Sequence, residues 1–243
     1  MSFFRREPDP GADERFFGRD RQGLVEMVVR MGALVRENLE SAVRGLTERD
    51  EAAALAGASG DDGVDEMEVQ VEQECLRLLA LRQPVREDLR FVFAVLRIVK
   101  DLERMGDEAE NVAEEALRLF PEPAPLPLEG PLRRMGELCF EMVDDALDAL
   151  VRGDAPLAER VVRRDDDVDA LWFQVREDTV RLLGTCPPEG ELGARRTLTE
   201  LSAARHLERV GDHATNVAEL AFFVLTGKRL REERPAPPPA PEA

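Results

Sequence analysis

Long apolar runs are absent from this chain of 243 residues, and no window approaches the roughly eighteen apolar residues that a membrane-spanning helix needs. Residues 1–8 lack the apolar core of a secretory signal peptide. The three cysteines, Cys75, Cys139 and Cys186, are isolated, which argues against a disulfide framework and a zinc knuckle. These absences predict a soluble cytoplasmic protein that meets a membrane only through a partner.

Positive charge is also scarce, because 33 Lys and Arg residues stand against 51 Asp and Glu residues, for a net charge of -18. Nucleic-acid affinity comes mainly from basic side chains that neutralise phosphates, so we expect no nucleic-acid partner. The chain has no Walker loop, no nucleotide-binding glycine fingerprint and no Ser or Cys nucleophile with a neighbouring base. Neither histidine has a Glu three residues before it, as a di-iron bundle would require. We therefore expect no enzymatic activity.

An internal repeat is the main feature that the chain does have. Residues 100–114 and 205–219 agree at ten positions with a constant offset of 105. Earlier segments agree at an offset of 104: residues 30–32 and 134–136 both read Arg-Met-Gly, and residues 77–79 and 181–183 both read Arg-Leu-Leu. The repeat spans about 100 residues, which is far beyond the scale of chance similarity.

Apolar residues recur at helical spacing over residues 20–48, 64–81 and 88–120, with a shorter helical segment at 50–58, and no stretch alternates with period two. The sequence therefore predicts an all-α protein of two tandem, pseudo-symmetric three-helix bundles. The expected organisation is a flexible leader at 1–18, the first bundle at 19–120, a proline-rich linker at 121–131, the second bundle at 132–228 and a disordered proline-rich tail at 229–243.

Each repeat carries a Glu-x-x-x-Asp pair, Glu103 with Asp107 and Glu208 with Asp212. A spacing of four places both carboxylates on one side of a helix, where like charges cost about 0.2–0.5 kcal/mol. The preceding helix of each repeat supplies a second pair at the same spacing. These second pairs are Asp61 with Asp65 and Asp165 with Asp169.

Antiparallel packing of these helices would give each repeat a site of four carboxylates. Such hard oxygen ligands suit Mg, Mn, Ca or oxidised Fe and can accept Zn. The alternative is that these are ordinary solvated surface carboxylates, partly neutralised by neighbouring Lys and Arg side chains. Gly106 and Gly211, which lie inside the expected helices, are predicted to permit a close helix approach. His206 and His213 are interpreted as two exposed, unrelated histidines.

Three segments closely resemble the signatures of the PhoU family of bacterial phosphate-signalling and phosphate-transport regulators: residues 81–90 (LRQPVREDLR), 100–107 (KDLERMGD) and 206–212 (HLERVGD). The resemblance covers about residues 20–228. It implies two tandem three-helix bundles, often assembled as a homodimer. It also implies a regulatory adaptor that links the phosphate ABC importer, through its ATPase, to a sensor histidine kinase, and that represses the phosphate-starvation response when phosphate is plentiful.

The family's Glu/Asp-x-x-x-Asp motifs have been associated with iron or zinc clusters. The resemblance thus implies Fe or Zn, where the ligand chemistry also allows Mn or Mg, on eight residues with Asn111 and Asn216 behind them: Asp61, Asp65, Glu103, Asp107, Asp165, Asp169, Glu208 and Asp212. Residues 186–193 depart from the family's turn motif, so the second site has less support. The alternative function is a metal-binding carboxylate bundle with a storage or metal-dependent catalytic role.

Overall fold

The computed structural model describes residues 10–120, 126–184 and 190–230, with side chains from Gly18 onward. Within these ranges the chain forms helices and no strand. The helices are α1 (Pro10–Glu48), α2 (Glu51–Gly57), α3 (Asp61–Arg82), α4 (Arg86–Leu119), α5 (Glu129–Arg152), α6 (Ala155–Gly184) and α7 (Glu191–Thr226). None of the helices in the described part is long and apolar enough to cross a membrane.

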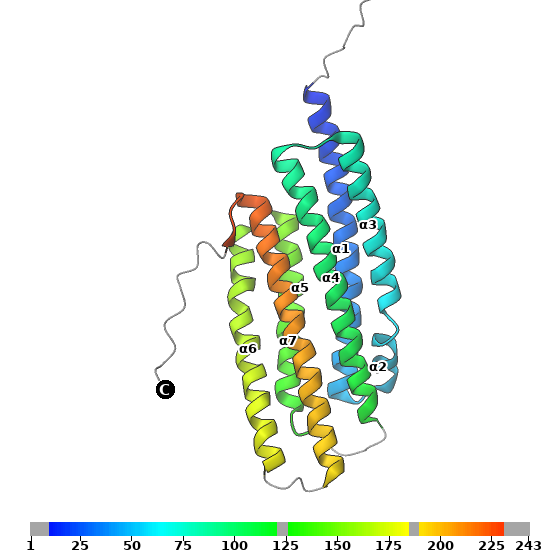
Figure 1. The fold of residues 1–243 in the computed structure, drawn as a ribbon, viewed down its shortest axis with the longest axis vertical. Coiled ribbons are helices and arrows are strands. Elements are labelled where there is room, and N and C mark those ends of the chain that lie inside the picture. The colour runs from blue at the N-terminus through cyan, green and yellow to red at the C-terminus, as the bar shows by residue number, and fades with distance from the viewer. Residues whose placement is uncertain (1–9, 121–125, 185–189, 231–243) are drawn as a thin grey trace, which may run out of the picture.

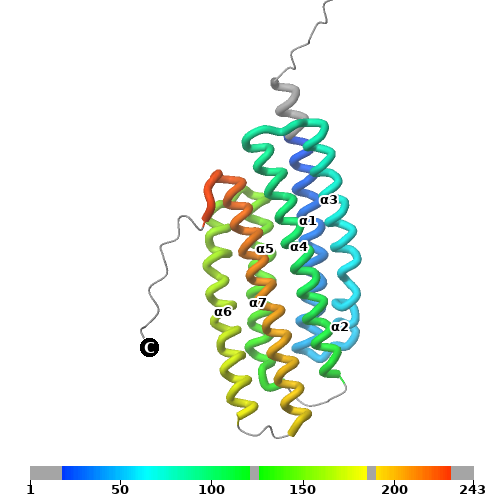
Figure 2. Tube along the Cα trace, viewed as in Figure 1, coloured from blue at the N-terminus to red at the C-terminus, as the bar shows by residue number. Residues whose placement is uncertain are grey.

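The helices form two bundles side by side (Figure 1). α1, α3 and α4 pack together with the short α2, and α5, α6 and α7 form the second bundle. The bundles meet along two seams, α4 against α7 and α1 against α5. Figure 2 follows the chain from the first bundle into the second. This confirms the predicted pair of tandem, pseudo-symmetric bundles, since each repeat supplies one bundle of equivalent helices.

The helix starts in the two repeats use the same capping chemistry. The Asp50 carboxylate accepts a hydrogen bond from the Ala53 amide at 3.0 Å before α2. Asp154, its equivalent, accepts one from the Leu157 amide at 2.9 Å in the first turn of α6. An Asp side chain in this position satisfies an amide that has no partner within the helix.

One difference between the repeats lies between α2 and α3. Ser59 and Gly60 separate these helices, whereas Arg163 and Arg164 at the equivalent positions belong to the single long helix α6. The side-chain amide of Asn38 donates to the carbonyl of Gly60 at 2.8 Å, which holds the break against α1. Arg is a much better helix former than Gly, so the helix of the second repeat continues through these positions.

The seam between α1 and α5 shows the pseudo-twofold relation of the repeats. Gly32 of α1 lies against the side chain of Leu147, and Gly136 of α5 lies against the side chain of Val43. A Cβ atom at Gly136 would be only 2.7 Å from Val43 Cγ1. Gly32 and Gly136 are equivalent at the offset of 104, as are Val43 and Leu147. A glycine therefore packs against a larger apolar side chain at two places along this seam, once with the glycine on α1 and once with the glycine on α5.

The observed bounds differ from the expected organisation at its edges. α1 begins at Pro10, inside the expected leader, and residues 1–9 lie outside the described residues. α5 begins at Glu129, inside the expected linker, and Leu126 and Leu128 are buried in the core. Leu230, in the expected tail, is also buried, and residues 231–243 lie outside the described part. The core therefore extends beyond the expected bounds at Leu126, Leu128 and Leu230.

Candidate functional site

The first carboxylate cluster lies where the start of α3 meets the middle of α4. Gly106 of α4 makes this approach possible, because a Cβ atom there would lie 2.7 Å from Asp61 Oδ1 and 3.3 Å from Val64 Cγ1 of α3. The predicted role of this glycine is therefore confirmed. The Asp61 carboxylate is brought to the turn of α4 that carries Glu103 and Asp107, which is the antiparallel arrangement that the repeated spacing required.

The electrostatics of the first cluster reflect this crowding. The pKa of Asp61 is raised from 3.8 to about 6, mainly by burial and then by the negative charges of Asp65, Asp107, Glu110 and Glu103 in that order. Asp61 Oδ1 and Glu103 Oε2 are buried and have no hydrogen-bond partner. Buried carboxylate oxygens almost always have a partner, so this cluster presents unsatisfied acceptors.

Glu68 is a member of this cluster that the sequence analysis missed. One oxygen each from Asp65, Glu68 and Glu103 lie within 4.8 Å of one another. Lys100 contacts two of these side chains, with Nζ at 2.8 Å from Glu103 Oε1 and 3.3 Å from Glu68 Oε1. Glu68 lies one turn after Asp65 on α3, so the run Asp61, Asp65, Glu68 at helical spacing was the signal that could have identified it.

The second cluster gathers the four predicted carboxylates of the other repeat. The pKa of Asp165 is raised to about 6, mainly by burial and then by the negative charges of Asp169 and Asp212. Burial also raises the pKa of Glu208, whose Oε2 is buried without a hydrogen-bond partner, and Asp212 adds to the effect. All eight predicted residues therefore fall into two clusters, four in each repeat. At Gly211 an added Cβ atom would lie 3.4 Å from Asp165 Oδ1, an ordinary van der Waals distance, so the close approach predicted at this glycine does not require it.

A basic side chain accompanies each cluster at the same repeat position. Arg205, the equivalent of Lys100, pairs with Glu208, and its guanidinium lies 5.8 Å from the ring centroid of Trp172. Trp172 stands where the first repeat has Glu68, and Thr215 stands where it has Glu110. Lys100 and Arg205 thus neutralise part of the charge of the clusters, as the alternative interpretation predicted for Lys100, Arg104, Arg205 and Arg209, whereas Arg209 pairs with Glu108 outside the clusters. The second cluster has fewer carboxylates, since two acidic positions are replaced.

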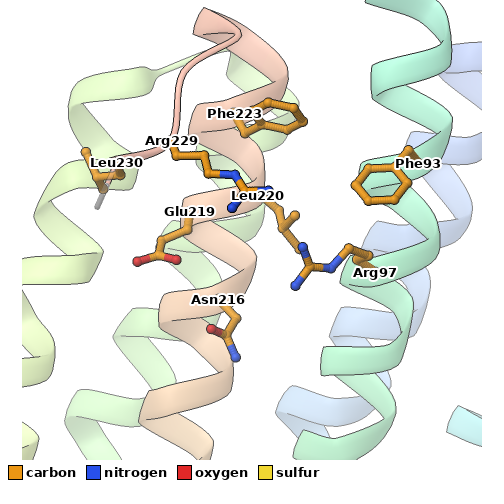
Figure 3. A pocket seen from close by; sticks show the side chains of 8 residues that line it. All are labelled: Phe93, Arg97, Asn216, Glu219, Leu220, Phe223, Arg229 and Leu230. Atoms are coloured by element: carbon orange, nitrogen blue, oxygen red, sulfur yellow. The ribbon is translucent and has the colours of Figure 1, made fainter. Parts of the chain in front are cut away.

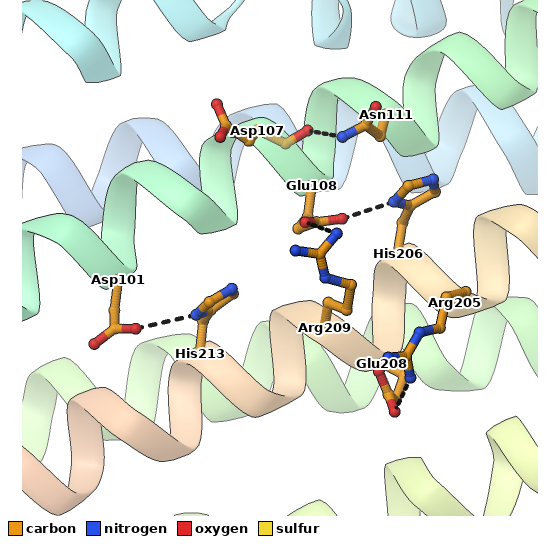
Figure 4. Close-up of polar contacts among 9 residues, drawn as sticks. All are labelled: Asp101, Asp107, Glu108, Asn111, Arg205, His206, Glu208, Arg209 and His213. Carbon is orange, nitrogen blue, oxygen red and sulfur yellow. Dashed lines mark hydrogen bonds and ion pairs between the residues drawn. The ribbon is translucent and has the colours of Figure 1, made fainter.

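The two histidines lie at the seam between α4 and α7 and not at the carboxylate clusters (Figure 4). His206 Nδ1 is 2.6 Å from Glu108 Oε2, and His213 Nδ1 is 3.0 Å from Asp101 Oδ1. His213 is only 9% exposed. The interpretation of two exposed, unrelated histidines was therefore wrong. The side of α7 that faces away from the carboxylates packs against the other repeat. The residue spacing of one helix does not show which partner that side contacts.

These seam contacts are also reciprocal. His206 is the repeat equivalent of Asp101, and His213 is the equivalent of Glu108. His206 therefore pairs with Glu108, the equivalent of His213, and His213 pairs with Asp101, the equivalent of His206. Arg209 Nη1 also contacts Glu108 Oε1 at 2.7 Å. The acidic residues of one repeat and the histidines of the other join the two bundles.

The two asparagines predicted to lie behind the clusters have other partners. The side-chain amide of Asn111 donates to the backbone carbonyl of Asp107 at 2.8 Å. The amide of Asn216 donates to Asp101 Oδ1 at 3.2 Å, across the seam. Asn111 thus supports the α4 turn of the first cluster, and Asn216 belongs to the contact between repeats.

These features define a class of protein: an all-α chain of two pseudo-symmetric three-helix bundles, each with a carboxylate cluster between its second and third long helices. A family model described as the PhoU domain matches residues 28–116 and again residues 132–221. The chain belongs to the PhoU family, because the two matches together cover well over half of it.

Similar proteins agree with this assignment. A phosphate-specific transport system accessory protein PhoU homolog of Aquifex aeolicus is 38% identical over 208 residues, which is 86% of this chain and 92% of the relative. The Caulobacter vibrioides homolog of the same name is 34% identical over 223 residues, 90% of this chain and 94% of the relative. The crystal structure of PhoU from Pseudomonas aeruginosa matches with a TM-score of 0.82 at 35% identity, covering 87% of this chain and all of that structure.

Proposed function

We propose that this chain is a cytoplasmic regulatory adaptor of phosphate uptake and phosphate-starvation signalling. It contacts the phosphate ABC importer ATPase and a sensor histidine kinase, and it represses the starvation response when phosphate is plentiful. The observation that supports this best is the match of both repeats, over most of the chain, to relatives named phosphate-specific transport system accessory proteins. The proposal includes a homodimer and no catalytic activity of the chain itself.

Exposed apolar residues on α3 and α6 support a role in protein contacts. Val69 and Leu76 of α3 are more than half exposed, and so are their repeat equivalents Phe173 and Val180 of α6. A single exposed apolar residue needs no explanation, but the same pair recurs at equivalent positions in both repeats. The exposed Leu55, by contrast, has Glu159 as its equivalent. We therefore place partner contacts on these paired positions.

We also propose that both carboxylate clusters bind metal ions. The donor sets consist of hard oxygen ligands, and Asp61, Glu103 and Glu208 each contribute a buried oxygen without a hydrogen-bond partner. Iron, zinc, manganese or magnesium would satisfy these oxygens and neutralise the crowded negative charge. A metal ion held between two long helices would join them, so its role in this proposal is structural or regulatory.

Co-purification of the full chain with the importer ATPase and with the kinase, at high and low phosphate, tests the adaptor role. We expect both partners to be retained at high phosphate. The double variants Val69→Ser/Leu76→Ser and Phe173→Ser/Val180→Ser should weaken retention, whereas Leu55→Ser, which removes an unpaired exposed leucine, should not. Failure of the unaltered chain to retain either partner at high phosphate would contradict the proposal.

A further inference from the structure

A pocket of about 300 Å³ lies at the seam between α4 and the end of α7, apart from both carboxylate clusters (Figure 3). α4 contributes Phe93 and Arg97, and the remaining lining residues belong to α7 and the segment after it. These are Asn216, Glu219, Leu220, Phe223, Arg229 and Leu230. The volume is at the lower end of the range for small-molecule sites.

Two guanidinium groups in this pocket stand out against a chain with a net charge of -18. Arg97 extends from α4 toward α7, and Arg229 reaches in from the residues after α7 (Figure 3). Among the described residues, neither has a hydrogen bond or ion pair. Arg90, on the same face of α4, is engaged by contrast, since it donates to the Val224 carbonyl at 3.0 Å. Arg97 and Arg229 are therefore available to an anionic ligand.

The pocket also has aromatic walls. Phe93 of α4 and Phe223 of α7 lie on opposite sides of it, and Phe93 is 51% exposed. Phenyl rings favour stacked or edge-on contact with a flat ring. Glu219 also lines the pocket, but its carboxylate points away from α4 in this view and therefore away from Phe93 and Arg97.

The equivalent place at the other end of the seam has different chemistry. There the repeat equivalents of Phe93, Arg97 and Phe223 are Leu198, Ser202 and Arg118. Ser202 and Arg118 are used internally, because Glu115 accepts from the Ser202 hydroxyl at 2.9 Å and from Arg118 at 2.6 Å, and Leu198 offers no aromatic ring. The combination of free guanidinium groups and phenyl rings is thus a feature of one end only, and the pseudo-symmetry of the fold does not require it.

We propose that this pocket binds a nucleoside phosphate. The phosphate would lie on Arg97 and Arg229, whose planar forks match phosphate oxygens, and the base would lie against Phe93 and Phe223. An inorganic anion would use only the guanidinium groups, and a neutral nucleoside would use only the rings. The guanidinium groups and the rings together select a ligand that has both a phosphate and a base.

Calorimetric titration of the full chain, in buffer that contains EDTA so that the carboxylate clusters hold no metal, tests this site. The probes are the four common nucleoside monophosphates, the matching diphosphates, inorganic phosphate and adenosine. We expect at least one nucleotide to bind at least about tenfold more tightly than inorganic phosphate or adenosine, since stacking of one base on an aromatic side chain alone is worth roughly that much.

Three variants locate the binding. Arg97→Gln and Phe93→Leu, the second of which copies the residue of the other repeat, should each weaken nucleotide binding by about tenfold or more. Both side chains are exposed, so neither change removes core packing. Arg118→Gln, at the opposite end of the seam, is the control and should bind as the unaltered chain does.

Three results would overturn the proposal. The first is no binding of any nucleotide at millimolar concentration, and the second is equal binding of nucleotide and inorganic phosphate. The third is nucleotide binding that Arg97→Gln and Phe93→Leu leave unchanged. Binding of an acidic peptide in the absence of nucleotide binding would also overturn it and assign the pocket to a protein partner.

Discussion

The two carboxylate clusters occupy equivalent places in the two repeats but differ in charge. The first gathers six carboxylates, because Glu68 and Glu110 join the four predicted residues, and Lys100 pairs with two of the six. The second has Trp172 and Thr215 at those two positions, and its basic residue, Arg205, both pairs with Glu208 and lies beside the tryptophan ring. Duplication thus conserved the four-residue arrangement, while the surrounding residues made one cluster more acidic than the other.

This difference has a physical consequence for cation binding. Each added carboxylate increases the attraction for a cation and supplies another ligand, and ligand charge is one of the factors that set metal affinity. A basic side chain must be displaced in both clusters before a metal can use the equivalent glutamates, Lys100 from Glu103 and Arg205 from Glu208, so the number of carboxylates is what distinguishes the clusters. The first cluster should therefore bind a metal ion more tightly than the second.

Removing the α4 or α7 pair should have the largest effect on metal binding. Glu103→Gln/Asp107→Asn should abolish most of the metal-dependent stabilisation, which for a single site amounts to about 2.7 kcal/mol at a metal concentration of 100 Kd. Glu208→Gln/Asp212→Asn should remove a smaller part. Differential scanning calorimetry with and without Mn²⁺ or Zn²⁺, combined with elemental analysis of freshly purified protein, measures both. A larger loss from the second pair would reverse the proposed order of the sites.

Exchange of the residues that distinguish the clusters should have a smaller effect. Glu68→Gln is expected to weaken metal binding at the first cluster by roughly tenfold, or about 1.4 kcal/mol. Trp172→Glu should strengthen the second cluster by a similar factor. Glu66→Gln, which removes an exposed carboxylate from another face of α3, is the control for net charge. Isothermal titration with Mn²⁺ reports these changes, and equal effects of Glu68→Gln and Glu66→Gln would show that position 68 has no special role.

The sequence predicted the four-residue core of each cluster because the information is local. Helical spacing places Glu103 with Asp107 and Asp61 with Asp65, and the repeat indicates that both pairs belong to one arrangement. Contacts between the repeats could not be predicted in this way. The pairing of His213 with Asp101 depends on which face of α7 packs against α4, and the periodicity of one helix does not contain that information. The continuity of α6, by contrast, can be inferred from the sequence, because the good helix formers Arg163 and Arg164 replace Ser59 and Gly60.

The pH dependence of stability should be alike for the two clusters in the absence of metal. The pKa values of Asp61 and Asp165 are both raised from 3.8 to about 6, so the folded state binds more protons than the unfolded state between these values. The free energy of unfolding should therefore fall as the pH rises from about 4 to about 6. Asp61→Asn and Asp165→Asn should each reduce this fall to a similar extent.

Urea denaturation in EDTA at several pH values from about 4 to about 7 measures this slope for the unaltered chain and both variants. Glu200, whose pKa burial raises to about 7, contributes a fall of the same sign in all three proteins and so does not affect the comparison. A slope that neither variant changes would mean that these two aspartates titrate alike in the folded and unfolded chains.

The smallest expected difference concerns the glycines under the two clusters. Replacing an interior helical glycine by alanine stabilises a helix by up to about 1 kcal/mol when the methyl group fits. At Gly211 the nearest atoms lie 3.4 Å from the added Cβ, so Gly211→Ala should keep most of that gain. At Gly106 the Asp61 carboxylate lies at 2.7 Å and must move. Gly106→Ala should therefore stabilise the fold less and also weaken metal binding at the first cluster, as thermal unfolding with and without Mn²⁺ would measure. Equal behaviour of the two variants would mean that the closer approach of α3 to α4 does not position Asp61 for the site.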